Sequence, residues 1–181
     1  MKALIVIDYS YDFVADDGKL TAGKPAQVIE GNILKHMEDF LKRGDLVVIT
    51  MDCHEENEKG HPETKLFPPH NIRGTEGREL YGKVRRFFEA NRHCNNLIWL
   101  DKTRYSSFFN TKLDEILKEK NISDIYLTGV CTDICVLHTA VDAYNLGYNI
   151  GVYSDSVASF NKDAHETALA HFKNSLGAEI L

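Results

Sequence analysis

A cysteine that directly follows a predicted strand is the residue in this sequence best suited to covalent chemistry. Cys135 comes after the predicted strand 124–128, and it lies in the first turn of a predicted helix at 132–146. The N–H groups and the dipole at a helix N-terminus stabilise an anion, so a thiol there is expected to lose its proton more readily. Because the thiolate is a nucleophile, this placement predicts nucleophilic catalysis.

An acidic and a basic residue follow two other predicted strands. Asp8 closes the apolar run 3–7, and Lys102 follows the predicted strand 97–100. Taken alone, Asp8 is more typical of an aspartate in a turn, and Lys102 is more typical of a solvated lysine in a loop. Next to a thiol, Asp8 is predicted to act as the general base, and Lys102 as a fixed cation that keeps the carboxylate ionised and stabilises the thiolate. His138 is a rival base, ranked lower because it lies one turn further along the helix.

A metal site is predicted in the long polar loop 52–80, which follows the predicted strand 45–51. The spacing D-x-H places two side chains on the same side of a strand end, and the loop supplies a further histidine and glutamate. Two imidazoles and two carboxylates suit a divalent transition metal, with Zn expected first and Fe or Mn as alternatives. The predicted ligands are Asp52, His54, Glu63 and His70. His61 competes with Glu63 for the fourth position, whereas Cys53 is expected to pack in the interior.

Composition narrows the class of protein. The chain has 181 residues, a length that predicts one domain over 1–181. Its net charge of −6 indicates no basic face that could bind nucleic acid. No apolar run is long enough to cross a bilayer, and the run 3–7 is too short for a signal peptide. A cytoplasmic protein with mostly reduced cysteines is therefore expected. The spacing of Cys131 and Cys135 is C-x3-C rather than the C-x2-C of redox motifs.

Strands and helices alternate along the chain, apart from the loop 52–80. The expected strands are 3–7, 45–51, 97–100, 124–128, 149–153 and 178–181, and the expected helices are 27–42, 79–91, 111–120, 132–146 and 162–175. This order predicts an α/β fold: a three-layer α/β/α, Rossmann-like doubly wound domain with a six-stranded, mainly parallel sheet. Ligands of such sheets bind beyond the carboxyl ends of the strands, where all the singled-out residues fall.

Several motifs together resemble a known superfamily over nearly the whole chain. They are Ile7-Asp8 with Asp12-Phe13, Thr50-Met51-Asp52-Cys53-His54, Phe67-Pro68-Pro69-His70 with Gly74-Thr75-Glu76-Gly77, Asp101-Lys102, and Gly129-Val130-Cys131-Thr132-Asp133-Ile134-Cys135-Val136. This set looks like the isochorismatase-like cysteine hydrolases, and within them the nicotinamidases, also called pyrazinamidases. One departure is Asn71, where many relatives have Cys.

The resemblance assigns roles to residues that the patterns alone leave open. It implies a catalytic triad of Asp8, Lys102 and Cys135, together with the metal ligands Asp52, His54 and His70. The fourth protein ligand varies within the family, so Glu63 is a choice made for this sequence. It also implies a cis peptide between Val130 and Cys131, which would direct the N–H groups of Cys131 and Cys135 at an oxyanion. The residues expected around the substrate are Phe13, Phe67, Tyr105, Val130 and Cys131.

The activity implied by the resemblance is hydrolysis of nicotinamide to nicotinic acid and ammonia, in NAD salvage, through a thioester on Cys135. Pyrazinamide is an expected second substrate, and a homo-oligomer is left open. The main alternative is another cysteine amidohydrolase of the superfamily that acts on a carbamoyl or ureido substrate. A flavodoxin-like binding module is disfavoured because no G-x-G-x-x-G follows the first strand. A metal-storing or redox-sensing protein, with Cys131 and Cys135 paired, is a third alternative.

Overall fold

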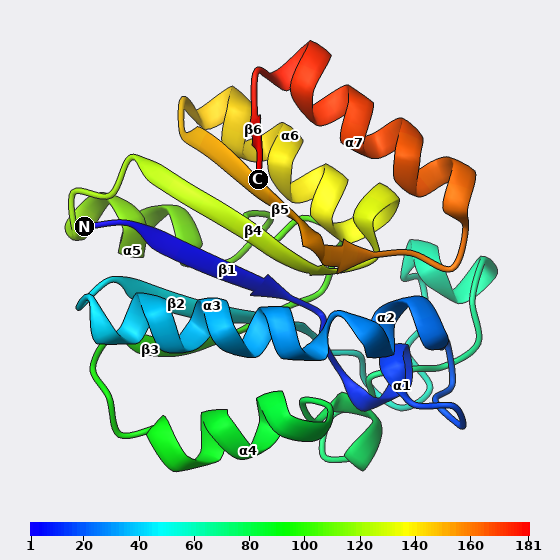
Figure 1. Ribbon diagram of the computed structural model, residues 1–181. Coiled ribbons are helices and arrows are strands. Elements are labelled where there is room, and N and C mark those ends of the chain that lie inside the picture. Colours follow the sequence, from blue (N-terminus) through cyan, green and yellow to red (C-terminus); the bar gives the residue numbers. More distant parts are fainter.

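A six-stranded parallel sheet with strand order β3-β2-β1-β4-β5-β6 forms the centre of the computed structural model, which describes residues 1–181 (Figure 1). Its strands are β1 Ala3–Ile7, β2 Leu46–Asp52, β3 Leu97–Lys102, β4 Asp124–Val130, β5 Asn149–Ala158 and β6 Glu179–Ile180. The predicted fold class is therefore confirmed, with every strand pair parallel.

Helices cover both faces of the sheet (Figure 1). They are α1 Tyr11–Val14, α2 Lys24–Val28, α3 Glu30–Lys42, α4 Gly82–Asn91, α5 Leu113–Glu119, α6 Leu137–Leu146 and α7 Lys162–Leu176. Alternate residues of β1 enter two separate apolar clusters: Ile5 packs with residues of α5, α6 and α7, and Val6 packs with residues of α1 to α4. A strand covered on both faces explains why the whole of β1 is apolar. None of the helices has both the length and the apolar character that crossing a membrane would need.

The structure corrects several predicted boundaries. The single helix expected at 27–42 is two helices: α2 begins at Lys24 with Pro25 in its first turn and ends at Val28, and α3 begins at Glu30. The helix expected at 132–146 begins as a wide π-type turn at Thr132–Val136, and the α-helix starts only at Leu137. Strand β5 continues five residues beyond the predicted end at Tyr153. The loop 52–80 contains two 3₁₀ turns, at Pro62–Lys65 and Glu76–Arg78.

Strands β1 and β4 approach closely just before the candidate nucleophile, at Gly129. This glycine has a φ of +112°, which side chains rarely adopt. A Cβ built there would lie 2.0 Å from the carbonyl oxygen of Ile7, the last residue of β1 before Asp8. Only glycine therefore allows the two strand ends to lie at this separation.

Gly129→Ala is expected to lower the free energy of unfolding by about 2 kcal/mol or more, because the new methyl group meets backbone atoms and the backbone conformation is strained. Urea unfolding followed by circular dichroism measures the change. Gly147→Ala is the matched control: Gly147 also has a positive φ, but no atom lies within 4 Å of its Cβ position, so about 1 kcal/mol is expected. Equal losses in both variants would contradict a special role for the contact with Ile7.

Candidate active site

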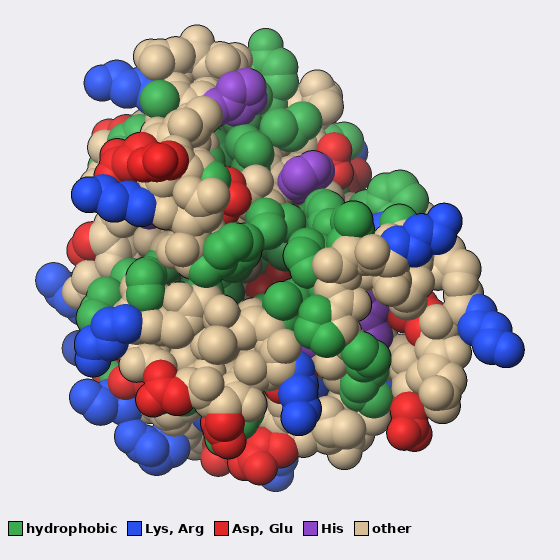
Figure 2. Space-filling view, turned by 90° about the vertical axis from the view of Figure 1, so that its right-hand side faces the viewer, with side chains coloured by type: hydrophobic (Ala, Val, Ile, Leu, Met, Phe, Trp, Pro, Cys, Tyr) green, Lys and Arg blue, Asp and Glu red, His purple; other side chains and the backbone are tan.

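Four of the predicted site residues meet at the carboxyl edge of the sheet. Asp8 directly follows β1, Asp52 and Lys102 are the last residues of β2 and β3, and Cys135 lies in the turn after β4. The register of the sheet places Asp52 beside Lys102. Figure 2 views this edge and shows a hollow bordered by hydrophobic side chains. Parallel strands end at one edge, which explains how residues far apart in the sequence come together.

The ammonium group of Lys102 is at the centre of the site. Its Nζ lies 2.7 Å from Oδ2 of Asp8 and 2.5 Å from Oδ1 of Asp52. It also donates a hydrogen bond of 3.0 Å to the carbonyl oxygen of Arg104, and it lies 3.9 Å from Sγ of Cys135. Lys102 and both carboxylates are almost fully buried. One cation therefore compensates two buried acids and contacts the thiol.

Burial and charge set the protonation states of this cluster. Burial opposes the charged form of Lys102, but Asp52 and Asp8 outweigh it, and the pKa of Lys102 is raised. Burial and the negative charge of Asp52 raise the pKa of Asp8. Burial also raises the pKa of Cys135, with Lys102 acting in the opposite direction. The expectation of a readily ionised thiol is therefore wrong, because desolvation outweighs the helix N-terminus: the resting thiol is protonated and needs a base.

Asp8 is placed to be that base. A carboxylate oxygen of Asp8, one of Asp52 and the sulfur of Cys135 lie within 4.8 Å of one another. The carboxylate is oriented by the N–H of Asp52, which donates to Oδ1 over 2.8 Å. The N–H of Asp8 itself donates to the carbonyl oxygen of Thr50, so both its backbone and its side chain are held by β2.

The predicted metal ligands form a second cluster that shares Asp52 with the first. One atom from each of Asp52, His54, Glu63 and His70 lies within 4.8 Å of the others, and all four side chains are buried. Oδ2 of Asp52 and Nε2 of both histidines have no hydrogen-bond partner. Converging buried atoms without partners are what a cation would satisfy, so the residues present fit a divalent metal.

The two histidines are oriented by their other ring nitrogens. Nδ1 of His54 donates to the carboxylate of Glu58 over 3.0 Å, and Nδ1 of His70 donates to the carbonyl oxygen of Pro68 over 2.8 Å. Each of these bonds leaves Nε2 as the acceptor that faces the cluster. The orienting groups were not predicted from the sequence, although Glu58 lies only four residues after His54.

The geometry favours Glu63 over His61 as the fourth ligand. Nδ1 of His61 accepts the N–H of Glu63, and its Nε2 donates to the carbonyl oxygen of Thr103 over 2.6 Å. Both ring nitrogens of His61 are therefore engaged. Oε2 of Glu63 lies 3.8 Å from Nε2 of His70 and 4.0 Å from Nε2 of His54.

A mainly apolar cavity joins the two clusters. It is lined by Phe13, Leu20, Asp52, Glu63, Phe67, His70, Tyr105, Cys131, Ile134, Cys135 and Phe160. The expected contacts Phe13, Phe67, Tyr105 and Cys131 are among them. Val130 is not among them, because its side chain is fully buried and packs in the core between the sheet and α1 to α4. Its peptide bond to Cys131 is cis, as the resemblance implied.

Three lining residues were missed, namely Leu20, Ile134 and Phe160. Phe160 follows β5 by two residues, so the rule that ligands bind beyond strand ends would have found it if the strand had been predicted to its full length. Ile134 lies inside the motif that contains both cysteines. Leu20 lies in a loop after α1, and nothing in the sequence pattern indicates it.

Asp12 connects the metal-binding loop to α1. Its carboxylate accepts the N–H of Asn71 over 2.8 Å and that of Lys19 over 3.2 Å. Gly77 packs directly on it, because a Cβ there would lie 2.2 Å from Oδ2. Asn71 thus meets Asp12 through its backbone, which explains how this position can differ from relatives without loss of that contact.

The remaining chemistry-bearing residues have other surroundings. All four cysteines are free, so no disulfide joins Cys131 to Cys135, and Cys53 is buried as expected. His138 does not line the cavity, and its Nδ1 donates to the carbonyl oxygen of Ile134. Its rank below Asp8 as a base agrees with this position.

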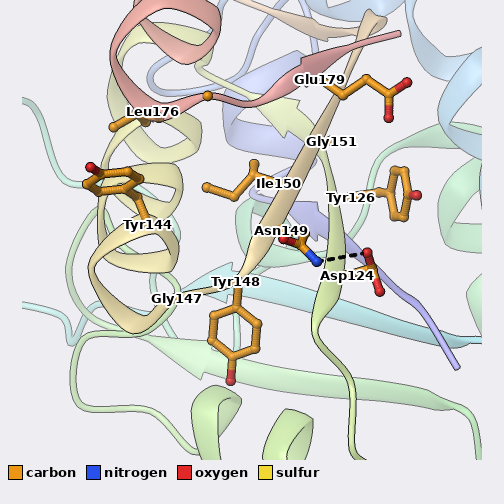
Figure 3. Close-up of a pocket in the computed structure, with 11 residues that line it drawn as sticks. Asp124, Tyr126, Tyr144, Gly147, Tyr148, Asn149, Ile150, Gly151, Leu176 and Glu179 are labelled. Carbon is orange, nitrogen blue, oxygen red and sulfur yellow. Dashed lines mark hydrogen bonds between the residues drawn. The ribbon is translucent and has the colours of Figure 1, made fainter.

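A second cavity, of about 400 Å³, lies at the opposite, amino edge of the sheet (Figure 3). Asp124 and Asn149, the first residues of β4 and β5, are hydrogen-bonded beside it. Its lining contains three tyrosines and two carboxylates but no cysteine, histidine or lysine. This cavity therefore contains none of the thiol and imidazole groups that line the one at the carboxyl edge.

Comparisons with known proteins agree with the site. The family model of the isochorismatase domain matches residues 2–181. An uncharacterized isochorismatase family protein, PncA, of Bacillus subtilis is 54% identical, with 99% of this chain and 98% of that protein covered. The crystal structure of a pyrazinamidase/nicotinamidase from Streptococcus mutans is 54% identical, with a TM-score of 0.98 and full coverage of both chains.

Two more distant solved structures bear on ligands. The pyrazinamidase of Pyrococcus horikoshii, in complex with zinc, is 28% identical with a TM-score of 0.86, and covers 99% of this chain and 98% of its own. The N-carbamoylsarcosine amidase of Thermoplasma acidophilum is 32% identical with a TM-score of 0.85, and covers 99% and 95%. Sequence and structure thus agree over the whole domain, and the chain belongs to the isochorismatase family and, within it, to the nicotinamidase/pyrazinamidase group.

Proposed function

We propose that this chain is a nicotinamidase, an amidohydrolase that converts nicotinamide to nicotinic acid and ammonia. The observation that carries the proposal is a single cavity that brings the thiol together with three of the four candidate metal ligands. Its lining includes Cys135, Asp52, Glu63 and His70. Asp8 and Lys102 lie beside the thiol. The role suits NAD salvage in the cytoplasm, where nicotinamide is the small-molecule partner.

The side chains supply each proton that the reaction needs. Asp8 takes the proton of Cys135, and the sulfur attacks the carboxamide carbon. The N–H groups of Cys131 and Cys135 donate to the resulting oxyanion. Asp8 then returns the proton to the departing nitrogen, which leaves as ammonia, and a thioester remains. Asp8 removes a proton from water as the water attacks the thioester, and it passes that proton to the sulfur as the C–S bond breaks. This frees nicotinic acid and restores the thiol of Cys135. Lys102 keeps the site's charge balanced throughout.

The second cluster orients the substrate in this proposal. Asp52, His54, Glu63 and His70 would hold a divalent cation, with zinc as the first choice. When bound, the cation supplies a Lewis acid for the ring nitrogen of nicotinamide. Phe13, Phe67 and Tyr105 line the same cavity and would flank the aromatic ring. Pyrazinamide has a similar ring and the same carboxamide, and is proposed as a second substrate.

A carbamoyl or ureido compound is the second candidate substrate class, favoured by the similarity to N-carbamoylsarcosine amidase. Ammonia release from nicotinamide, pyrazinamide and N-carbamoylsarcosine, measured with one enzyme preparation, separates the two. The proposal expects kcat/KM to be highest for nicotinamide. A higher value for N-carbamoylsarcosine would refute it.

Cys135→Ala is expected to lower kcat for nicotinamide by at least about 1,000-fold, because no other thiol lies beside Asp8 and Lys102. Ammonia release and circular dichroism together separate lost chemistry from lost folding. Cys94→Ala is the control: Cys94 packs against the core away from the cavity, so its kcat is expected to stay near that of the unchanged protein. Substantial turnover by Cys135→Ala would rule out catalysis through this thiol.

His54→Ala is expected to reduce bound zinc per chain and to raise KM for nicotinamide by at least about tenfold, because one of four converging ligands is removed. Zinc content is measured by atomic spectrometry after dialysis. His138→Ala removes a histidine outside the cluster and should leave zinc content and kcat unchanged. Undiminished zinc in His54→Ala would show that the ligand assignment is wrong.

A further inference from the structure

We propose that three buried hydroxyl groups, those of Thr50, Ser107 and Thr139, form a positioning cluster that sets where the thiol of Cys135 lies relative to Asp8 and Lys102. None of the residues of this hydroxyl cluster lines the cavity or belongs to the cluster of candidate metal ligands. Its effect on turnover rests on the proposed amidase function, whereas its effect on the thiol's position does not.

The three hydroxyls bond to one another. The Oγ atoms of Thr50 and Ser107 are 2.8 Å apart. The hydroxyl of Thr139 donates to Oγ of Ser107 over 3.2 Å, and the backbone N–H of Ser107 donates to Oγ1 of Thr139 over 3.0 Å. All three residues are fully buried. Ser107 therefore links β2, which contains Thr50, to α6, which contains Thr139.

Each end of this link leads to a site residue. Thr139 lies four residues after Cys135, which is about one helical turn further along. On the other side, Thr50 precedes Asp52 by two residues on β2, and its carbonyl oxygen accepts the N–H of Asp8. The cluster thus ties the helix that follows the nucleophile to the strand that holds the proposed base.

The cluster also fixes one end of a segment that borders the cavity. The segment 103–107 is held at its start by the hydrogen bond from Nζ of Lys102 to the carbonyl oxygen of Arg104. It is held at its end by Ser107, whose own carbonyl oxygen accepts the hydroxyl of Thr111. Tyr105, between the two, lines the cavity. A shift of Ser107 would move Tyr105 in the wall of the cavity. It would also move the carbonyl oxygen of Arg104, which accepts a hydrogen bond from the ammonium group of Lys102.

Stability alone does not explain three matched hydroxyls here. The neighbouring Phe108, Val136 and Ala140 belong to the apolar core, and an apolar replacement of a complete hydrogen-bonded set is close to neutral for folding. What the hydroxyls add is direction, because hydrogen bonds fix distances and angles that contacts between methyl groups leave loose. A sulfur 3.9 Å from its cationic neighbour needs that control.

Thr139→Val and Thr139→Ser test the hydroxyl separately from the volume. Valine keeps the shape and loses the hydroxyl, whereas serine keeps the hydroxyl and loses a methyl group. We expect Thr139→Val to lower kcat for nicotinamide by at least about tenfold with little change in KM, and Thr139→Ser to stay within about twofold. Thr128→Val is the matched control, because it removes an equally buried hydroxyl that donates only to the carbonyl oxygen of Ile5. Its kcat is expected to be unchanged.

A second readout does not depend on amidase activity. The rate of alkylation of Cys135 by iodoacetamide is followed by mass spectrometry of its peptide, and it is expected to fall at least about threefold in Thr139→Val but not in Thr139→Ser. If the unchanged protein does not hydrolyse nicotinamide, the proposed function fails, yet these alkylation rates still decide the positioning role. Unchanged kcat and alkylation in a folded Thr139→Val would overturn the proposal, as would equal losses in the valine and serine variants.

Discussion

The arrangement of this protein depends on one buried ammonium group. Lys102 lies in the interior between two carboxylates, and each of the three charges would be costly there without the others. The sheet makes the arrangement attainable, because neighbouring parallel strands are about 4.8 Å apart and all end at one edge. Charges placed at the ends of β1, β2 and β3 therefore meet without any long reach by Asp8 or Asp52.

The same burial explains why the site needs a base and a cation together. Desolvation keeps the thiol of Cys135 protonated, and it also makes the Asp8 carboxylate a stronger proton acceptor than one in water. Lys102 acts against burial at both groups, because its positive charge favours the carboxylate and the thiolate alike. A solvent-exposed thiol at a helix N-terminus would ionise unaided but would not be shielded from competing reactions.

Much of this site could be predicted from the sequence, because continuous apolar runs and period-3.6 patterns locate the strand ends and the parallel sheet gathers them. Asp8, Asp52, Lys102 and Cys135 were found in this way. What failed was of two kinds. Boundaries were misplaced where β5 runs on past Tyr153 and where a π-type turn precedes α6, and the first of these errors hid Phe160. The ionisation of the thiol was wrongly expected because the sequence does not show how deeply Cys135 is buried. The choice between Glu63 and His61 depended on which ring nitrogens were already bonded, and sequence does not contain that information.

Asp52 divides its two oxygens between different neighbours: Oδ1 faces the lysine, and Oδ2 faces the histidines. An acid at this position is therefore required by the electrostatics around the thiol even in a chain that binds no metal. When other sequences of this fold are read, an aspartate at the end of the second strand is uninformative about metal dependence. The imidazoles at the positions of His54 and His70 are the residues that discriminate.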